Sequence, residues 1–352
     1  MSTKKNEPAR LVFFERLGHP AGFSLLEQRP HIDVRCLDFD QGEDSIWSEF
    51  ADAHVYQIRS TRSELPSQYF AHEALLERCP NLLAVSTNGS GADTVDIDAC
   101  TRAGVLVVNQ AGGNREAVAE HAIGMMLCLS KRIMEADRAI RSVPGLARES
   151  LIGHDVLGRT LGIIGLGHVG TRTAELARGL FGMRVIATDP YVDDAVFERC
   201  GVERMELDDM LAASDYVSVH CPRNAETLRM MNADRFAKMR SHAYFITTAR
   251  GGIHDEQALA DALRAGTIAG AGVDVWEQEP PPLDHPLLAL DNVILSPHTA
   301  GVTHEARYNM VSQTLDQIDT IIAGGRPPRL LNPQAWEAYA ERYQRLFHKR
   351  PG

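Results

Sequence analysis

Thr160-Leu161-Gly162-Ile163-Ile164-Gly165-Leu166-Gly167-His168-Val169-Gly170 is the stretch that decides the fold. Its first five residues form a short apolar run, typical of a strand buried on both faces. The glycines that follow permit a tight turn into a helix that we expect to reach about residue 181. Similar apolar runs, such as residues 184–189 and 244–247, alternate with helical segments along the chain. This alternation predicts an α/β protein with parallel sheets.

The glycine-rich turn has the spacing Gly-x-Gly-x-x-Gly, which is a weak signal by itself. Here it follows a strand and opens a helix. Gly165 would permit the turn, Gly167 would let a pyrophosphate approach the helix N-terminus, and Gly170 would let helix and strand pack closely. Asp189 ends the next strand, about 20 residues after the last glycine, where a carboxylate binds ribose hydroxyls and repels a 2′-phosphate. The pattern therefore predicts NAD(H) rather than NADP(H), the alternative being a purely structural glycine turn.

The fingerprint lies near the middle of the chain, so we expect one domain to be inserted into another. The predicted dinucleotide-binding domain of the Rossmann type spans residues 114–301. Residues 1–113 and 302–352 would together form a second α/β domain, which we expect to bind the substrate. Helices at about 114–141 and 303–323 would cross between the two.

Three strand ends in the second half carry an arginine, a carboxylate and a histidine. Arg250 precedes two glycines, Glu279 precedes three prolines, and His298 follows Pro297. Each residue has an ordinary alternative, since solvated arginines, loop carboxylates and packed histidines are common. Because the carboxyl ends of parallel strands line one crevice, the three side chains can meet there. Beside a nicotinamide, such a trio suits hydride transfer to a 2-keto acid.

The composition narrows the possible partners and the compartment. The net charge of -11 argues against nucleic acid as a main partner, and no apolar run approaches a membrane span. The six cysteines contain no Cys-x-x-Cys pair, and the 14 histidines contain no His-x-x-x-His spacing, so we expect reduced thiols and no metal site. The start of the chain lacks the apolar core of a signal peptide. These features predict a cytoplasmic protein.

Motifs along residues 55–330 resemble those of the D-isomer-specific 2-hydroxyacid dehydrogenases. They are Asn88-Gly89-Ser90-Gly91-Ala92-Asp93, Val118-Ala119-Glu120-His121, Gly165 to Gly170, His220-Cys221-Pro222, Ala249-Arg250-Gly251, Asp274-Val275, Glu279-Pro280 and Pro297-His298. The resemblance implies a Rossmann-type NAD-binding domain inserted into a flavodoxin-like catalytic domain. It also implies a homodimer formed through the NAD-binding domain, acting on a small 2-keto or 2-hydroxy acid.

The resemblance further implies a role for each matched residue. His298 would protonate the substrate carbonyl, Glu279 would stabilise the protonated imidazole, and Arg250 would hold the keto acid. Substrate would also be bound by the loop residues Asn88, Gly89 and Ser90. Arg59 would bind a substrate phosphate, if one is present, although a strand end with solvated arginines is the more common explanation of such a residue. Asp274 would contact the nicotinamide carboxamide. The remaining residues of the cofactor cleft would be His168, Val169, His220, Cys221, Pro222, Thr227, Thr247, Thr248, Ala249, His298 and Gly301.

Two other functions stay open at this point. A formate dehydrogenase shares the scaffold but typically carries Gln at the position of Glu279, so the glutamate disfavours it. A non-enzymatic NAD(H) sensor of the co-repressor type keeps much of the same site. Turnover of any 2-keto acid would separate an enzyme from such a sensor.

Overall fold

The computed structural model describes residues 8–352 of the chain. They form two compact units: the chain up to Asn114 together with Thr303–Gly352, and Arg115–Val302. Residues 1–7, on which the expectation of a missing signal peptide rests, lie outside the described part. None of the helices within residues 8–352 combines the length and the apolar character needed to span a lipid bilayer.

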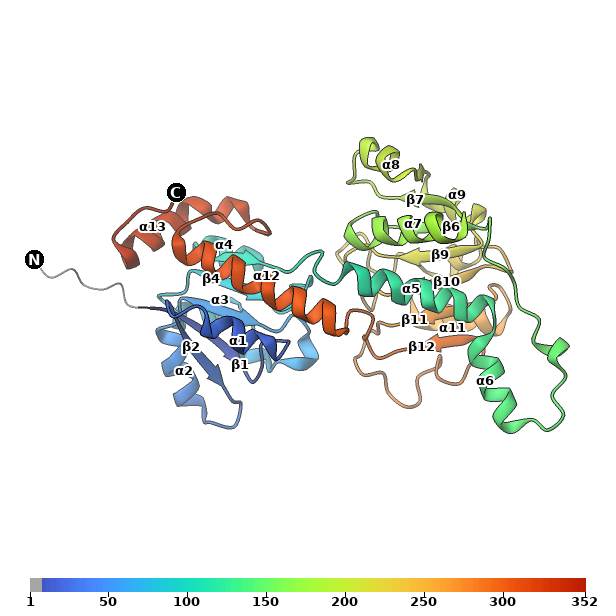
Figure 1. The fold of residues 1–352 in the computed structure, drawn as a ribbon, viewed down its shortest axis with the longest axis horizontal. Coiled ribbons are helices and arrows are strands. Elements are labelled where there is room, and N and C mark those ends of the chain that lie inside the picture. The colour runs from blue at the N-terminus through green and yellow to red at the C-terminus, as the bar shows by residue number, and fades with distance from the viewer. Residues whose placement is uncertain (1–7) are drawn as a thin grey trace, which may run out of the picture. The chain divides into compact units, whose positions relative to one another are not determined.

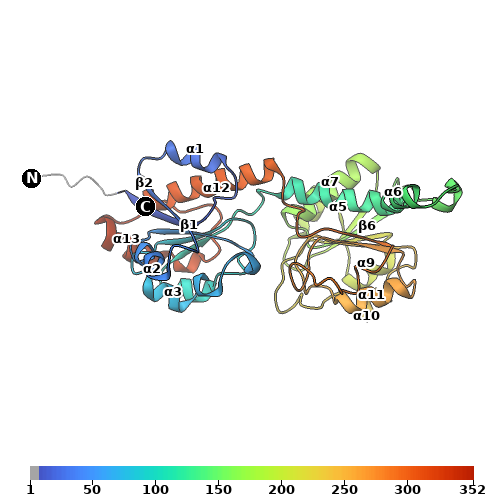
Figure 2. The same ribbon diagram turned by 90° about the horizontal axis from the view of Figure 1, so that it is seen from below.

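The first unit contains a five-stranded parallel sheet in the order β2-β1-β3-β4-β5. This order is that of flavodoxin-like folds and confirms the expected fold class. The strands are β1 (Ala9–Phe14), β2 (Ile32–Leu37), β3 (Val55–Ile58), β4 (Ala84–Thr87) and β5 (Leu106–Val108). The helices are α1 (Ala21–Glu27), α2 (Glu43–Ala51), α3 (Glu73–Arg78), α4 (Ile97–Arg102), α12 (His304–Ala323) and α13 (Trp336–Phe347), with short 3-10 turns at Arg62–Glu64, Ser67–Tyr69 and Pro333–Ala335. Within this unit, α1 and α12 lie on one face of the sheet and α2 and α3 on the other (Figure 2).

Both faces of this sheet are covered, which explains its continuous apolar strands. Leu11 and Phe13 of β1 belong to one apolar cluster, together with Leu315 of α12. Val12 and Phe14, which point the opposite way, belong to a second cluster. Successive side chains of a strand alternate between faces, so a strand buried on both sides is apolar at every position.

The C-terminal helix α13 completes the first unit. Arg342 donates hydrogen bonds to the carbonyl oxygens of Leu82 (2.6 Å), Ala103 (3.1 Å), Cys79 (3.1 Å) and Pro80 (2.8 Å). Tyr339, on the same helix, is fully buried. The tail, whose role is not readable from sequence, therefore provides a charged donor to four backbone carbonyls of the first unit.

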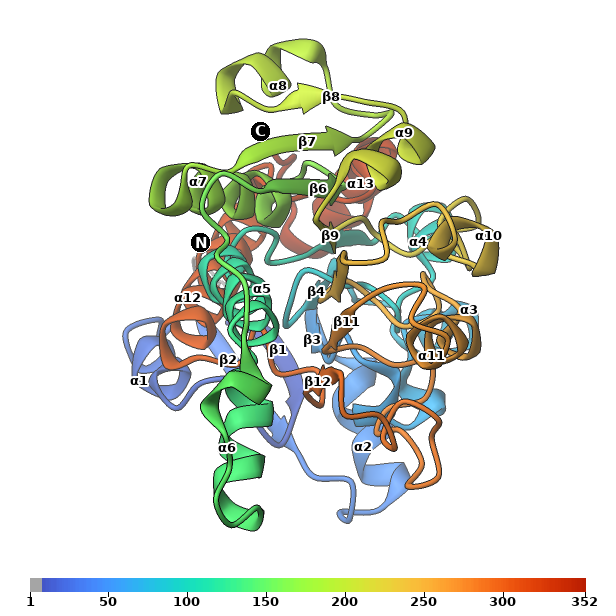
Figure 3. The same ribbon diagram turned by 90° about the vertical axis from the view of Figure 1, so that its right-hand side faces the viewer.

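The second unit contains a seven-stranded parallel sheet in the order β12-β11-β10-β9-β6-β7-β8. Counted from β6, this is the doubly wound order 3-2-1-4-5-6 with one additional edge strand, which confirms the Rossmann-type fold. The strands are β6 (Thr160–Ile164), β7 (Arg184–Thr188), β8 (Glu203–Arg204), β9 (Tyr216–Val219), β10 (Tyr244–Thr247), β11 (Gly270–Val273) and β12 (Val293–Leu295). Figure 3 shows β8, β7 and β6 in this order from one edge of the sheet.

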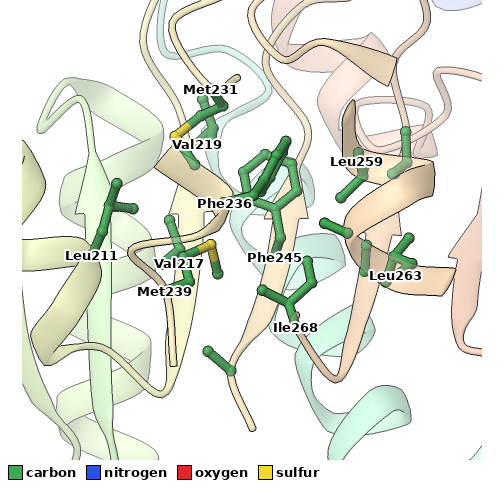
Figure 4. Packing of buried hydrophobic residues seen from close by; sticks show 14 of the residues in the cluster. Leu211, Val217, Val219, Met231, Phe236, Met239, Phe245, Leu259, Leu263 and Ile268 are labelled. Atoms are coloured by element: carbon green, nitrogen blue, oxygen red, sulfur yellow. The ribbon is translucent and has the colours of Figure 1, made fainter. Parts of the chain in front are cut away.

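Helices cover both faces of the second sheet. They are α5 (Arg115–Ser130), α6 (Ile133–Ser142), α7 (His168–Phe181), α8 (Asp194–Cys200), α9 (Leu207–Ala213), α10 (Ala233–Phe236) and α11 (Glu256–Arg264), with a 3-10 turn at Arg148–Leu151. In this unit α5 and α7 lie on one face, and α9, α10 and α11 on the other (Figure 2). Under the latter helices the core includes an edge-to-face pair of Phe236 and Phe245, with ring centroids 5.2 Å apart (Figure 4).

The structure departs from the sequence expectation at the helix predicted for residues 114–141. This helix is broken: α5 ends at Ser130, Arg132 adopts a left-handed φ of 52°, and α6 follows. The carbonyl of Ser130 accepts a hydrogen bond from His154 N (2.7 Å) instead of continuing the helix. No residue of α6 is buried, and the helix projects away from the sheet of its unit (Figure 1).

Candidate active site

Thr247 is the last residue of β10 and is fully buried. The other predicted site residues of the second unit lie in loops that follow the carboxyl ends of parallel strands or at the start of α7. His168 and Val169 open α7 after the glycine turn. The loops and their site residues are Asp189 after β7, His220, Cys221, Pro222 and Thr227 after β9, Thr248, Ala249 and Arg250 after β10, Asp274 and Glu279 after β11, and His298 and Gly301 after β12. This is the edge at which α/β sheets bind ligands.

His298 and Glu279 form a bonded acid–base pair. Nδ1 of His298 lies 2.9 Å from each carboxylate oxygen of Glu279. Burial disfavours the ionised carboxylate, but the hydrogen bond and charge of His298, the N–H of Trp276 and the charge of Arg250 outweigh it, so the pKa of Glu279 lies below its ordinary value. An ionised partner at Nδ1 orients the ring and leaves Nε2 available for proton transfer.

A buried carboxylate holds the loop that carries His298. Asp274 is completely buried, and its oxygens accept hydrogen bonds from Ser296 Oγ (2.6 Å), Thr299 N (2.8 Å) and Ala300 N (3.0 Å). Its carbonyl accepts from His298 N at 2.7 Å. His298 adopts a left-handed φ of 56°, a conformation that costs a non-glycine residue free energy and that these bonds stabilise.

Arg250 is held close to this pair by a contact between two backbones. A Cβ on the next residue, Gly251, would lie 1.8 Å from the carbonyl oxygen of Trp276. Only glycine therefore fits there, and the turn after β10 packs directly on the loop that carries Glu279. The guanidinium of Arg250 donates to the carbonyl of Ala249 at 2.7 Å, and its charge contributes to the lowered pKa of Glu279.

The glycine turn fits the pyrophosphate of a dinucleotide. A Cβ on Gly170 would lie 2.0 Å from the carbonyl oxygen of Gly165, and a Cβ on Gly165 would lie 2.6 Å from Cys221 N. Around Gly167, by contrast, a Cβ would meet nothing within 4 Å. The turn is thus closely packed inside and open at the N-terminus of the 14-residue helix α7, where N–H groups and the helix dipole attract phosphate.

Asp189, His220 and Cys221 lie on either side of the glycine turn, in the loops after β7 and β9. The carboxylate of Asp189 accepts hydrogen bonds from Leu166 N (2.9 Å) and Tyr191 N (3.0 Å), which fixes it beside the glycine turn. Burial lowers the pKa of His220 to about 4 and raises the pKa of Cys221 to about 11, so neither is charged near neutral pH. A carboxylate at this position fits a ribose diol better than a 2′-phosphate.

The hydroxyl of Thr227 forms hydrogen bonds within the loop after β9. Its hydroxyl donates to the carbonyl of Pro222 at 2.7 Å and lies 2.8 Å from Asn224 N. The hydroxyl therefore closes the loop after β9 on itself.

In the first unit, two backbone N–H groups of the loop after β4 have no hydrogen-bond acceptor among the described residues. The carbonyl of Gly89 accepts from Gln110 N at 2.9 Å, and the carbonyl of Ser90 accepts from Asn109 Nδ2 at 2.8 Å. The side-chain oxygen of Asn88 accepts from Ser60. With these oxygens turned inward, the N–H groups of Gly89 and Ser90 donate no hydrogen bond within residues 8–352. Such a pair of donors suits a carboxylate.

Arg59, the expected phosphate ligand, is engaged within its own unit. Its guanidinium forms an ion pair with Glu15 at 2.6 Å and donates to the carbonyls of Glu64 (3.0 Å) and Phe14 (3.4 Å). Its side chain is only 12% exposed. A substrate phosphate would have to displace these partners.

Sequence reasoning assigns no role to His121, Ser296 and Trp276, which the structure places around the trio. Trp276 N donates to Glu279 at 3.2 Å, and Nε2 of His121 lies 3.1 Å from Ser296 Oγ. The motifs that contain His121 and Ser296 are visible in the sequence, but nothing in their spacing shows that they meet.

Comparisons with known proteins relate this chain to one family of dehydrogenases. Residues 123–300 match the family model described as D-isomer specific 2-hydroxyacid dehydrogenase, NAD binding domain. The chain is 34% identical to a glyoxylate reductase of Thermofilum pendens over 92% of its own length and 94% of that protein. It is 41% identical to a D-3-phosphoglycerate dehydrogenase of Archaeoglobus fulgidus, over 69% of this chain, but covers only 46% of that longer protein.

Solved structures show the same similarity. D-lactate dehydrogenase from Aquifex aeolicus, complexed with NAD and lactic acid, superposes with a TM-score of 0.78 at 26% identity, covering 91% of this chain and 98% of that one. The similarity therefore extends over both units of the fold.

Proposed function

Because the chain belongs to the D-isomer-specific 2-hydroxyacid dehydrogenases, we propose that it interconverts a 2-keto acid and a D-2-hydroxy acid with NAD(H). The observation that carries this proposal is the His298–Glu279 pair, bonded at 2.9 Å and within the electrostatic reach of Arg250. A formate dehydrogenase has no proton to transfer and no need of such a pair.

In the proposed reaction the residues divide the work between binding and proton transfer. NADH, held at the glycine turn and by Asp189, supplies a hydride when bound. His298 donates a proton from Nε2 to the carbonyl oxygen, and Glu279 stabilises the charged imidazole before the transfer. Arg250 holds the substrate carboxylate and polarises the carbonyl. In the oxidative direction His298 accepts the proton instead.

We further propose that the substrate is a small 2-keto acid without a phosphate group. The free N–H groups of Gly89 and Ser90 support binding of its carboxylate. The engagement of Arg59 with Glu15 speaks against the use of this arginine as a phosphate ligand.

We propose, finally, that two copies of the chain associate through the second unit. α6 has no buried residue, yet Ile133, Met134 and Ile140 are 48%, 43% and 75% exposed. Apolar side chains gathered on a projecting helix are typical of a surface that another molecule covers. Sedimentation equilibrium of the wild type and of Ile140→Glu tests this, and a monomeric wild type would contradict it.

The test of the activity is NADH oxidation at the nicotinamide absorbance with a panel of 2-keto acids. Glyoxylate, hydroxypyruvate and pyruvate represent small acids, phenylpyruvate and 2-ketoisocaproate larger ones, and phosphohydroxypyruvate a phosphorylated one. We expect turnover of a small acid with NADH well above that with NADPH. No turnover with any acid, while NADH still binds, would favour a sensor. A preference for phosphohydroxypyruvate would refute the proposal that the substrate carries no phosphate group.

A further inference from the structure

We propose that His121 is a positioning residue for His298, acting through Ser296 and the buried carboxylate of Asp274. This inference rests on the proposed function only in that His298 is the acid of the reaction. The connection itself is a property of the fold and can be tested without substrate or cofactor.

The first step is the direction of the hydrogen bonds. Ser296 Oγ lies 2.6 Å from Asp274 Oδ1 and 3.1 Å from Nε2 of His121. An ionised carboxylate can only accept, so the single hydroxyl proton of Ser296 is donated to Asp274. Ser296 must then accept from His121, which requires the tautomer, or the charged form, with a proton on Nε2.

The second step is what this bond stabilises. Nε2 of His121 is 3.9 Å from Asp274 Oδ1, so this donor lies close to a carboxylate that has no exposure to solvent. A buried carboxylate is costly unless donors surround it. The donors to this carboxylate are Thr299 N, Ala300 N and the hydroxyl of Ser296. His121 contributes indirectly, because its hydrogen bond holds the Ser296 hydroxyl in place.

The third step connects the carboxylate to the chemistry. Asp274 holds the backbone of the loop that carries His298. Its carbonyl oxygen accepts a hydrogen bond from His298 N, and its side-chain oxygens accept hydrogen bonds from Thr299 N and Ala300 N. If the carboxylate moves, the left-handed backbone of His298 loses its support. α5, which carries His121, packs on β11 and β12, so the ring approaches the loop from a rigid helix.

The test measures amide hydrogen exchange of the apo protein in a peptide covering residues 296–302. His121→Leu removes the donor and Ser296→Ala removes the link, so each should speed exchange at Thr299 and Ala300 roughly tenfold. His121→Gln retains a donor at the position of Nε2 and should stay near the wild type. His154→Leu, at an exposed histidine of the same unit, should have no effect on this segment. Unchanged exchange in His121→Leu and Ser296→Ala would overturn the proposal.

Steady-state kinetics provide the second readout. We expect kcat to fall about tenfold or more in His121→Leu and Ser296→Ala, with little change in the Kd of NADH, and the double variant to be no worse than either single one. Recovery of kcat in His121→Gln would distinguish the hydrogen bond from simple packing. If the wild type turns over no 2-keto acid, the proposed function fails while the exchange result still decides the role of His121. If His121→Leu does not fold, His121→Met removes the same donor and takes its place in both measurements.

Discussion

Gly251 lies against the backbone carbonyl of Trp276 so closely that a Cβ would stand 1.8 Å from the oxygen. Through this one contact the turn that carries Arg250 is packed on the loop that carries Glu279. The relative position of the two charged side chains therefore depends on a residue without a side chain.

Gly251→Ala should separate these two loops. We expect a loss of about 1–3 kcal/mol in the free energy of unfolding, because the new methyl group must displace backbone, and a fall in kcat of about 100-fold, because Arg250 and Glu279 move apart. Urea unfolding and steady-state kinetics measure the two effects. Gly179→Ala is the matched control: this glycine lies in α7 with open space around it, so the variant should keep wild-type activity.

His298→Ala should lower kcat by about 10²–10⁴-fold, since this is the usual contribution of general acid–base catalysis. Binding of NADH, followed by its fluorescence, should remain within a few fold of the wild type. An unaltered kcat would remove His298 from the proposed mechanism.

Glu279→Gln should affect both activity and the pH dependence of stability. The folded protein lowers the pKa of Glu279 below its ordinary value of 4.5. The ionised carboxylate therefore stabilises the fold above pH 4.5, and this stabilisation is lost as the pH falls through the lowered pKa. The difference in unfolding free energy between wild type and variant should shrink between about pH 5 and pH 3. A difference that stays constant over this range would contradict the assignment. The kcat of the variant should also fall, because an amide cannot stabilise the charged imidazole.

Asp189→Asn should weaken the discrimination between the two nicotinamide cofactors. The amide oxygen can still accept from Leu166 N or Tyr191 N, but the negative charge that repels a 2′-phosphate is gone. The ratio of kcat/KM with NADH to that with NADPH should fall about tenfold or more, equivalent to roughly 1.4 kcal/mol. An unchanged ratio would place the discrimination elsewhere in the cleft.

Arg342→Ala should destabilise the first unit without altering the chemistry. Four carbonyl oxygens lose a charged donor, so we expect a loss of about 2–4 kcal/mol in unfolding free energy. Arg345→Ala, on the same helix, is the control, because Arg345 donates only one bond, to the exposed carbonyl of Pro80. Equal losses in the two variants would contradict the role given to Arg342.

The fold was accessible from sequence because its signals are local. The strand, glycine turn and helix around Gly165 are contiguous, and the fully buried strands are apolar at every position. The sequence does not predict the edge strand β2, since the half-buried Asp33 and Arg35 interrupt its apolar run. The break at Arg132 is missed as well, because it depends on His154 N reaching the carbonyl of Ser130.

The candidate site also contains some features that the sequence predicts and others that it does not. Parallel strands explain why Arg250, Glu279 and His298 are expected at one edge of the sheet. The engagement of Arg59 with Glu15 and the bond between His121 and Ser296 join residues distant in the chain, and no spacing rule predicts such pairs. The sequence thus predicts the candidate reacting groups more readily than the residues that hold them.

The packing of α12 and α13 on β1 also determines an order of events during synthesis. Leu11 and Phe13 share their cluster with Ile318, Ile321 and Tyr339, which leave the ribosome more than 300 residues later. The second unit has all its strands and helices between Arg115 and Val302, so it can fold while the ends of the first are still apart. Until the last helices emerge, the nascent chain exposes apolar surface of β1 that is prone to aggregation.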